Sequence, residues 1–234
     1  MPDLPARDLA TVRLAEMFGA PGCPLCRHRD DAVVRYIEGF MYESVNDVAF
    51  RKSLDEARGF CRPHTHAVLT GGRHVSGGML GSAILFGAVM RVRGQELQAV
   101  RSARSLARRR RAQEALRPPG CLVCAAESGA DKVAVDSVVR LSADPGWADA
   151  IGDAEVCLEH LAALMAASAR PPGWAAIEDR QLARVAALRA LVDGFAHNSS
   201  HDRQHLTTPV QTAAPGQAAA FLGGRPEDEA VRRR

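Results

Sequence analysis

Six cysteines and two histidines of the 234-residue sequence fall into four short motifs. Two motifs are C-x2-C pairs, Cys23–Cys26 (CPLC) and Cys121–Cys124 (CLVC), and two are C-x2-H pairs, Cys61–His64 and Cys157–His160. The motifs alternate along the chain, and no cysteine is left over. Because 98 positions separate Cys23 from Cys121 and 96 separate Cys61 from Cys157, the sequence contains an internal repeat.

Three thiolates and one imidazole form a ligand set that tetrahedral zinc favours. A C-x2-C turn brings two thiolates to one metal, and a C-x2-H pair can do the same from the first turn of a helix, where positions i and i+3 share a face. The N-terminus of a helix also favours the thiolate over the thiol. We therefore predict two zinc ions per chain, one for each copy of the repeat: site 1 is Cys23, Cys26, Cys61 and His64, and site 2 is Cys121, Cys124, Cys157 and His160.

Other interpretations of the same cysteines stay open. An iron–sulfur cluster could use these ligands, and the thiols could also be free of metal. A set of disulfides is disfavoured in a cytosolic chain of this size. His28 and His66 lie close to site 1 and could replace His64. Ala162 occupies the place that matches His66 in the second copy, so His64 is preferred.

The residues between the motifs predict helices. Apolar residues at Val33, Ile37, Phe40 and Met41 lie on one helix face, and a shorter helix over 48–57 ends at Gly59, just before Cys61. The second copy predicts a helix over 125–141 and a short one over 147–152. Since β-branched runs with a period of two are absent, we predict an all-α fold of two tandem repeats, each a C-x2-C knuckle, a helical hairpin and a helix that begins at C-x2-H.

A long basic helix is predicted between the two copies. The pattern over 79–116 is that of a single helix, and 91–117 contains nine arginines against two glutamates. Such a helix could bind nucleic acid or an acidic partner, but the basic run has no aromatic residue to stack on bases. A solvated helix is the favoured interpretation; the arginines predicted to share a face are Arg101, Arg104, Arg108 and Arg111.

The predicted organisation has four parts. They are the first repeat (1–78), the long connecting helix (79–118), the second repeat with a long helix over 174–197 (119–205), and a flexible tail (206–234). The most apolar stretch, 79–90, is shorter than the roughly 20 residues of a membrane-spanning helix. Because the start of the chain also has no charged tip followed by an apolar run, we predict a cytoplasmic protein with no membrane partner.

Five segments resemble those of a bacterial family of domains of unknown function: CPLC (23–26), YESVND (42–47), GFCRPH (59–64), CLVC (121–124) and CLEH (157–160). Members of that family carry a CPxC knuckle, a YExVND segment and a GFCxxH element, followed by a degenerate second copy. The second copy here departs from the pattern at EVCLEH, which has no glycine before the cysteine. The resemblance covers most of 15–200 and implies a helical, metal-tied fold without an assigned activity.

The expected function is inferred from the closed ligand sets. Four protein ligands leave no coordination position for a reacting water, so we predict a non-catalytic, zinc-stabilised scaffold or adaptor whose partner is another protein. A redox sensor or iron–sulfur protein is the first alternative, because thiolates can be oxidised. A regulatory protein that binds nucleic acid through 101–111 is the second.

Overall fold

The computed structural model describes residues 4–5, 8–117, 119–200 and 202–224. Over these residues the chain forms eleven α-helices, one short 3-10 helix (Gln204–Leu206) and no strand, so the all-α prediction is confirmed. None of the described helices has both the length and the apolar character needed to cross a membrane.

The contacts divide the chain into two units that differ from the predicted tandem repeats. Unit 1 comprises residues 1–30 and 130–234, and unit 2 comprises residues 31–129. Both boundaries fall inside long helices, α2 (Pro24–Glu43) and α7 (Leu122–Leu141). Each of these helices therefore begins in one unit and ends in the other. The sequence predicted two consecutive repeats, whereas in the structure unit 2 is inserted between the two stretches of unit 1.

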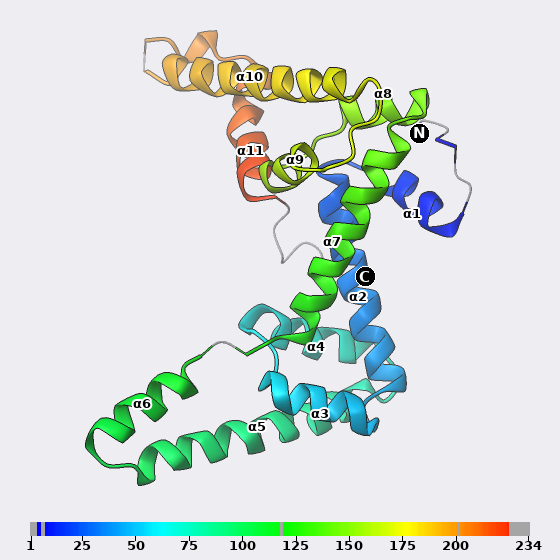
Figure 1. Cartoon of the computed structure of the whole chain (residues 1–234). Coiled ribbons are helices and arrows are strands. Elements are labelled where there is room, and N and C mark those ends of the chain that lie inside the picture. The colour runs from blue at the N-terminus through cyan, green and yellow to red at the C-terminus, as the bar shows by residue number, and fades with distance from the viewer. Residues whose placement is uncertain (1–3, 6–7, 118, 201, 225–234) are drawn as a thin grey trace. The chain divides into compact units, whose positions relative to one another are not determined.

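Unit 1 contains α1 (Leu9–Phe18), α8 (Pro145–Asp153), α9 (Leu158–Met165), α10 (Trp174–Asn198) and α11 (Pro209–Gly223). Trp147 on α8 is fully buried at the centre of its core, where the ring of Phe18 meets it edge-on at 5.5 Å. Figure 1 shows α10 lying beside α8 and α11, and contacts join these pairs of helices. The helix predicted over 174–197 is thus confirmed as α10.

Unit 2 contains α3 (Val48–Ala57), α4 (Arg62–His74), α5 (Gly78–Ser102) and α6 (Ser105–Ala115). Its core includes Phe40, which stacks on Phe50 and Phe60 with ring centroids 5.0 and 6.0 Å apart. The helix predicted over 48–57 is present as α3. Its first turn is capped by the side chain of Asp47, which accepts the N–H of Phe50 at 2.7 Å.

The end of α3 places the C-x2-H motif of unit 2. Arg58 and Gly59 both have positive φ angles, 63° and 104°, and this turn reverses the chain directly before Cys61. A Cβ on Gly59 would lie 2.7 Å from Cγ1 of Val89, so only glycine fits here. The Arg58 side chain donates to Glu96 on α5 at 2.5 Å, which fixes the turn against that helix.

The predicted long helix over 79–116 is wrong, because the helix is broken after Ser102. Ala103 and Arg104 are extended, with ψ angles of 153° and 144°, and α6 then folds back beside α5 (Figure 1). Side chains of α6 reach the last carbonyls of α5: Arg108 donates to Val100 and Arg101, and Arg111 to Ala99. Cations at the C-terminal end of a helix stabilise its unpaired carbonyl groups, which favours the hairpin.

The predicted flexible tail is also wrong over 209–223, which form α11. Thr208 and Gln211 make reciprocal hydrogen bonds that cap the first turn of this helix. Ala214 is fully buried, and α11 contacts both α10 and α9. Residues 225–234 of the predicted tail lie outside the described residues.

Candidate metal centres

The structure brings all eight predicted ligands into two clusters, but with a different pairing. In each cluster the four candidate ligand atoms lie within 4.8 Å of one another. The prediction that each repeat completes its own site is wrong, because each C-x2-C motif meets the C-x2-H motif of the other copy. Cluster A is Cys23, Cys26, Cys157 and His160, and cluster B is Cys61, His64, Cys121 and Cys124.

The long helices explain this exchange. After Cys23 and Cys26, helix α2 takes the chain out of unit 1, so Cys61 and His64 are reached within unit 2. A helix of 20 residues is about 30 Å long, and the chain after α2 stays in unit 2 and does not fold back to the start of this helix. Helix α7 returns the chain from unit 2 to unit 1 before Cys157 in the same way. Each cluster therefore lies wholly within one unit.

Cluster A is built around one nitrogen of His160. Cys23 and Cys26 lie at the start of α2, Cys157 is the N-cap residue of α9, and His160 is in the first turn of α9. Nδ1 of His160 lies 3.5 Å from Sγ of Cys23, 3.4 Å from that of Cys26 and 3.1 Å from that of Cys157. Sγ of Cys26 and Sγ of Cys157 are 3.6 Å apart. All four residues are buried, and the most exposed of them, Cys23, has only 7% of its surface accessible.

A carboxylate supports the other side of the His160 ring. Nε2 of His160 lies 3.3 Å from Oδ1 of Asp131 on α7. A carboxylate that accepts the Nε2–H keeps the proton of a neutral ring on Nε2, so Nδ1 is the nitrogen that a metal can bind. Arg29 lies 3.7 Å from the same carboxylate and 3.2 Å from that of Glu159, so Asp131 is itself held in place.

Cluster B repeats this arrangement in unit 2. Cys61 is the N-cap residue of α4, and Nδ1 of His64 lies 3.2 Å from Sγ of Cys61, 3.5 Å from that of Cys121 and 3.2 Å from that of Cys124. Sγ of Cys61 and Sγ of Cys124 are 3.6 Å apart. Nε2 of His64 lies 3.6 Å from Oε2 of Glu127 on α7. Neither cluster includes His66, so the preference for His64 is confirmed.

Sequence reasoning missed the two carboxylates. Glu127 and Asp131 follow Cys124 by three and seven positions on α7, and such positions lie on one face of a helix. This spacing is a signal that could have indicated them, because histidine ligands of metals commonly donate their second N–H to a carboxylate.

A model of a family of unknown function, DUF6062, matches residues 6–171. The chain belongs to this family. No curated protein and no solved structure matches it. The DUF6062 match contains all eight cluster residues and ends before α10 and α11, so the clusters belong to the part of the chain that the family model describes.

The electrostatics of cluster B in this DUF6062 chain favour binding of a cation. Burial alone would raise the pKa of Cys121, but hydrogen bonds from His64 and from the backbone of Cys61 and Cys124 lower it to about 6. Burial and the contacts with Cys61 and Cys121 raise the pKa of Cys124 to about 12. One thiol thus ionises readily, and its negative charge hinders ionisation of its neighbours. A bound cation is what allows all three to be thiolates together.

Cluster A also pairs one thiol of lowered pKa with a neighbour of raised pKa, and the shifts are larger than in cluster B. Hydrogen bonds from Cys23 and Cys26 hold the pKa of the Cys157 thiol below its usual range, and the contacts with Cys157 and Cys26, together with burial, raise the pKa of Cys23. Burial disfavours a charged His160, but hydrogen bonds to Asp131, Cys157 and Cys26 outweigh it and raise the pKa of His160 to about 11. A metal at Nδ1 would replace this proton and the thiol protons together.

The structure does not form the predicted arginine face. Arg101 is near the end of α5, Arg104 is extended between the helices, and Arg108 and Arg111 lie on α6. Because the helix is broken between them, the four residues do not share one face. Arg108 and Arg111 also donate hydrogen bonds to the last carbonyls of α5, so two of the four have a role within the fold.

Proposed function

We propose that the chain is a non-catalytic helical scaffold stabilised by two zinc ions, one in cluster A and one in cluster B. The observation that supports this most directly is the convergence of three thiols and one histidine Nδ1 in each cluster, with a carboxylate beside Nε2 of the histidine. Residues placed in this way have the ligand number, ligand types and outer support of structural zinc sites.

The distances support a single tetrahedral ion in each cluster. With Zn–S bonds of about 2.3 Å and Zn–N bonds of about 2.0 Å, the edges of a tetrahedron are about 3.8 Å between sulfurs and about 3.5 Å between sulfur and nitrogen. One Sγ–Sγ separation in each cluster, Cys26–Cys157 and Cys61–Cys124, is 3.6 Å, and the Sγ–Nδ1 separations are 3.1–3.5 Å. An iron–sulfur cluster spreads its protein ligands over several iron atoms, and ligand atoms within 4.8 Å of one another favour one ion instead.

The closed ligand sets support a structural role. Four protein ligands fill the tetrahedron, whereas a catalytic zinc keeps a position for water or substrate. Cluster A is in addition surrounded by the core of unit 1, beside Leu25, Val156 and Leu161. The expected consequence of metal binding is stability, since structural zinc sites contribute on the order of 10 kcal/mol.

Because unit 2 is inserted between the two stretches of unit 1, a metal in cluster A would join segments that are far apart in the sequence. Unit 1 is made of two separate stretches of chain, and cluster A links residues 23 and 26 of the first stretch to residues 157 and 160 of the second. Cluster B links α4 to the start of α7 inside unit 2. We propose that the two ions hold the interleaved chain in one fold on which a partner protein docks.

We assign the docking surface for this partner protein to the α5–α6 hairpin, because of the side chains that the hairpin exposes. It exposes several large apolar side chains next to its arginines; Leu97, Leu106 and Leu116 are each more than half exposed. Thiolate sites of this kind persist in a reducing compartment, so we also propose a cytoplasmic location.

Metal analysis tests the proposal. Protein purified from cells grown without added metal should contain two zinc ions per chain by elemental analysis. Removal of zinc by a chelator should lower the helical circular dichroism and the melting temperature, and zinc should restore both. Iron with a visible absorption band would contradict zinc, and unchanged dichroism after complete zinc removal would contradict a structural role.

A further inference from the structure

A pocket of about 590 Å³ lies in unit 1 between α10 and α11. Its walls are mainly apolar, and Gly22 and Cys23, directly before α2, also line it. Pockets of 300–1,000 Å³ with apolar walls and few polar groups are typical of small-molecule sites. The side chains that give the pocket its apolar character are Val185, Leu188 and Leu191 of α10 and Ala213, Ala220 and Phe221 of α11.

One wall of this pocket is held firmly. The buried side-chain amide of Gln181 on α10 donates to the carbonyls of Ile151, Gly152 and Ala154 at 2.7, 3.1 and 3.0 Å. These bonds fix the first half of α10 to the end of α8. The pocket is therefore formed by a positioned helix, which favours binding because little order has to be gained on association.

Arg184 supplies the positive charge of the pocket. It is one turn from Leu188 on α10 and lines the pocket, its side chain is exposed, and it forms no ion pair with any described residue. The carboxylate in the lining, Glu155, accepts the N–H of Gly22 at 3.0 Å. A guanidinium that has no ion pair among the described residues and lies beside an apolar cavity is suited to an anionic group, and it binds carboxylates through two parallel hydrogen bonds.

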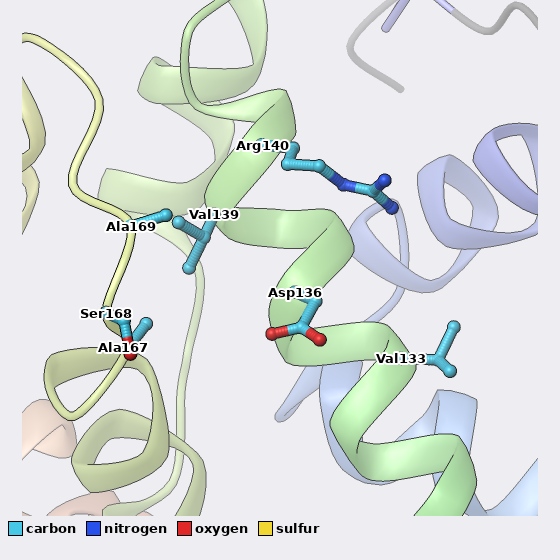
Figure 2. A pocket seen from close by; sticks show the side chains of 7 residues that line it. All are labelled: Val133, Asp136, Val139, Arg140, Ala167, Ser168 and Ala169. Carbon is cyan, nitrogen blue, oxygen red and sulfur yellow. The ribbon is translucent and has the colours of Figure 1, made fainter.

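A second hollow in unit 1 lacks this combination. It has a volume of about 400 Å³, and Figure 2 shows that the Arg140 side chain on α7 points away from the segment that contains Ala167 and Ser168. Charges of both signs on one helix line it, and few large apolar side chains accompany them. It is smaller than the α10–α11 pocket, and its arginine lies one turn from an aspartate of the same helix.

We infer that the α10–α11 pocket binds a small amphipathic anion, with an apolar body between the helices and a carboxylate at Arg184. The apolar body would displace water from Leu188, Leu191 and Phe221, which is the dominant favourable contribution to such binding. The inference goes beyond the scaffold function. It depends on the folded unit 1 and not on which metal occupies cluster A.

The first test measures whether the pocket is occupied. Decanoate should bind the metal-loaded full chain at one site in isothermal titration calorimetry. Ala187→Trp, which fills the pocket, should weaken binding at least tenfold, whereas Ala183→Trp on α10 outside the pocket lining should not. Equal metal content and melting temperature in the two variants would show that the loss is local. No binding of decanoate, or equal binding to both variants, would overturn the inference.

The second test measures the anion preference. Arg184→Gln should weaken decanoate binding about tenfold, the effect of one charge-assisted contact. The matched control, Arg189→Gln, changes an exposed arginine of the same helix that pairs with Asp193 and does not line the pocket. Decanol should bind equally to the unchanged chain and to Arg184→Gln. If decylamine binds better than decanoate, or if the two arginine variants behave alike, the anionic ligand class is wrong.

Discussion

Clusters A and B have the same ligand set but different surroundings. All four residues of cluster A are buried, whereas Cys61 and Cys124 of cluster B are half-buried. The carboxylate of Asp131 is 3.3 Å from Nε2 of His160, and that of Glu127 is 3.6 Å from Nε2 of His64. The difference shows that one ligand pattern, repeated in one chain, can give a site closed to solvent and a site that solvent reaches.

Solvent access governs how a metal leaves. Protons, chelators and oxidants must contact a thiolate before a bond to the metal is lost, so exposure of Cys61 and Cys124 opens a route that cluster A lacks. Cluster A also holds together the two stretches of unit 1, while unit 2 is a single continuous stretch. We therefore expect cluster A to be the fixed site and cluster B the exchangeable one.

The largest expected effect separates the observed pairing from pairing within each repeat. Cys23→Ser combined with Cys61→Ser removes one ligand from each cluster, whereas Cys23→Ser combined with Cys157→Ser removes two ligands from cluster A only. The first double variant should lose both zinc ions, and the second should keep one. Elemental analysis that gives the reverse result would restore the pairing predicted from the sequence.

Single ligand changes should affect the two units differently. Both tryptophans, Trp147 and Trp174, are buried in unit 1, so their fluorescence reports on that unit alone. Cys157→Ser should shift the emission to longer wavelength, because loss of a structural zinc site can remove on the order of 10 kcal/mol. Cys61→Ser should lower helical dichroism while leaving the emission unchanged. An equal red shift in both variants would show that the units do not respond separately.

The rate of zinc loss should follow the difference in burial. Under excess chelator we expect two phases, with the faster one from cluster B because two of its cysteines contact solvent. Tryptophan emission should change only in the slower phase. Zinc release can be followed with a colorimetric indicator and the emission in the same sample. A change in emission that accompanies the fast phase would contradict this assignment.

The carboxylates should give smaller effects. Outer partners of histidine ligands typically change metal affinity by about 10–100-fold. Asp131→Asn should weaken zinc binding in cluster A, and Glu127→Gln should do less to cluster B, because its contact is longer, 3.6 Å against 3.3 Å. Competition with a chelator of known affinity measures both. Equal losses would show that the separation of these atoms does not determine their contribution.

The sequence identified the eight residues that form the two clusters but predicted their pairing wrongly, for a physical reason. Ligand types and three-residue spacings are local, so the eight residues could be identified from the motifs. Pairing depends on where α2 and α7 take the chain, and both pairings complete a set of three cysteines and one histidine. Composition alone did not distinguish α11 from a loose tail, although Thr208 and Gln211 form a capping box that the sequence contains.

The break between α5 and α6 could not be predicted from the sequence. It falls at Ala103 and Arg104, and neither residue type is a helix breaker as proline and glycine are. Contacts between side chains and distant carbonyls stabilise it, and such contacts are visible only after the chain has turned. The same contacts lead to the prediction with the smallest expected effect.

Replacement of Arg108 and Arg111 by glutamine should lower the stability of the hairpin slightly. Both side chains are exposed and donate to carbonyls at the end of α5, where a cation typically contributes about 0.3–1 kcal/mol. The melting temperature should therefore fall by a few degrees at most, and less at high salt, because salt screens charges at a surface. Arg109→Gln is the matched control, since Arg109 is exposed on α6 and makes no such contact. If the control lowers the melting temperature as much as the double variant, the arginines act through net charge. If only the double variant does so, the capping contacts hold the hairpin closed.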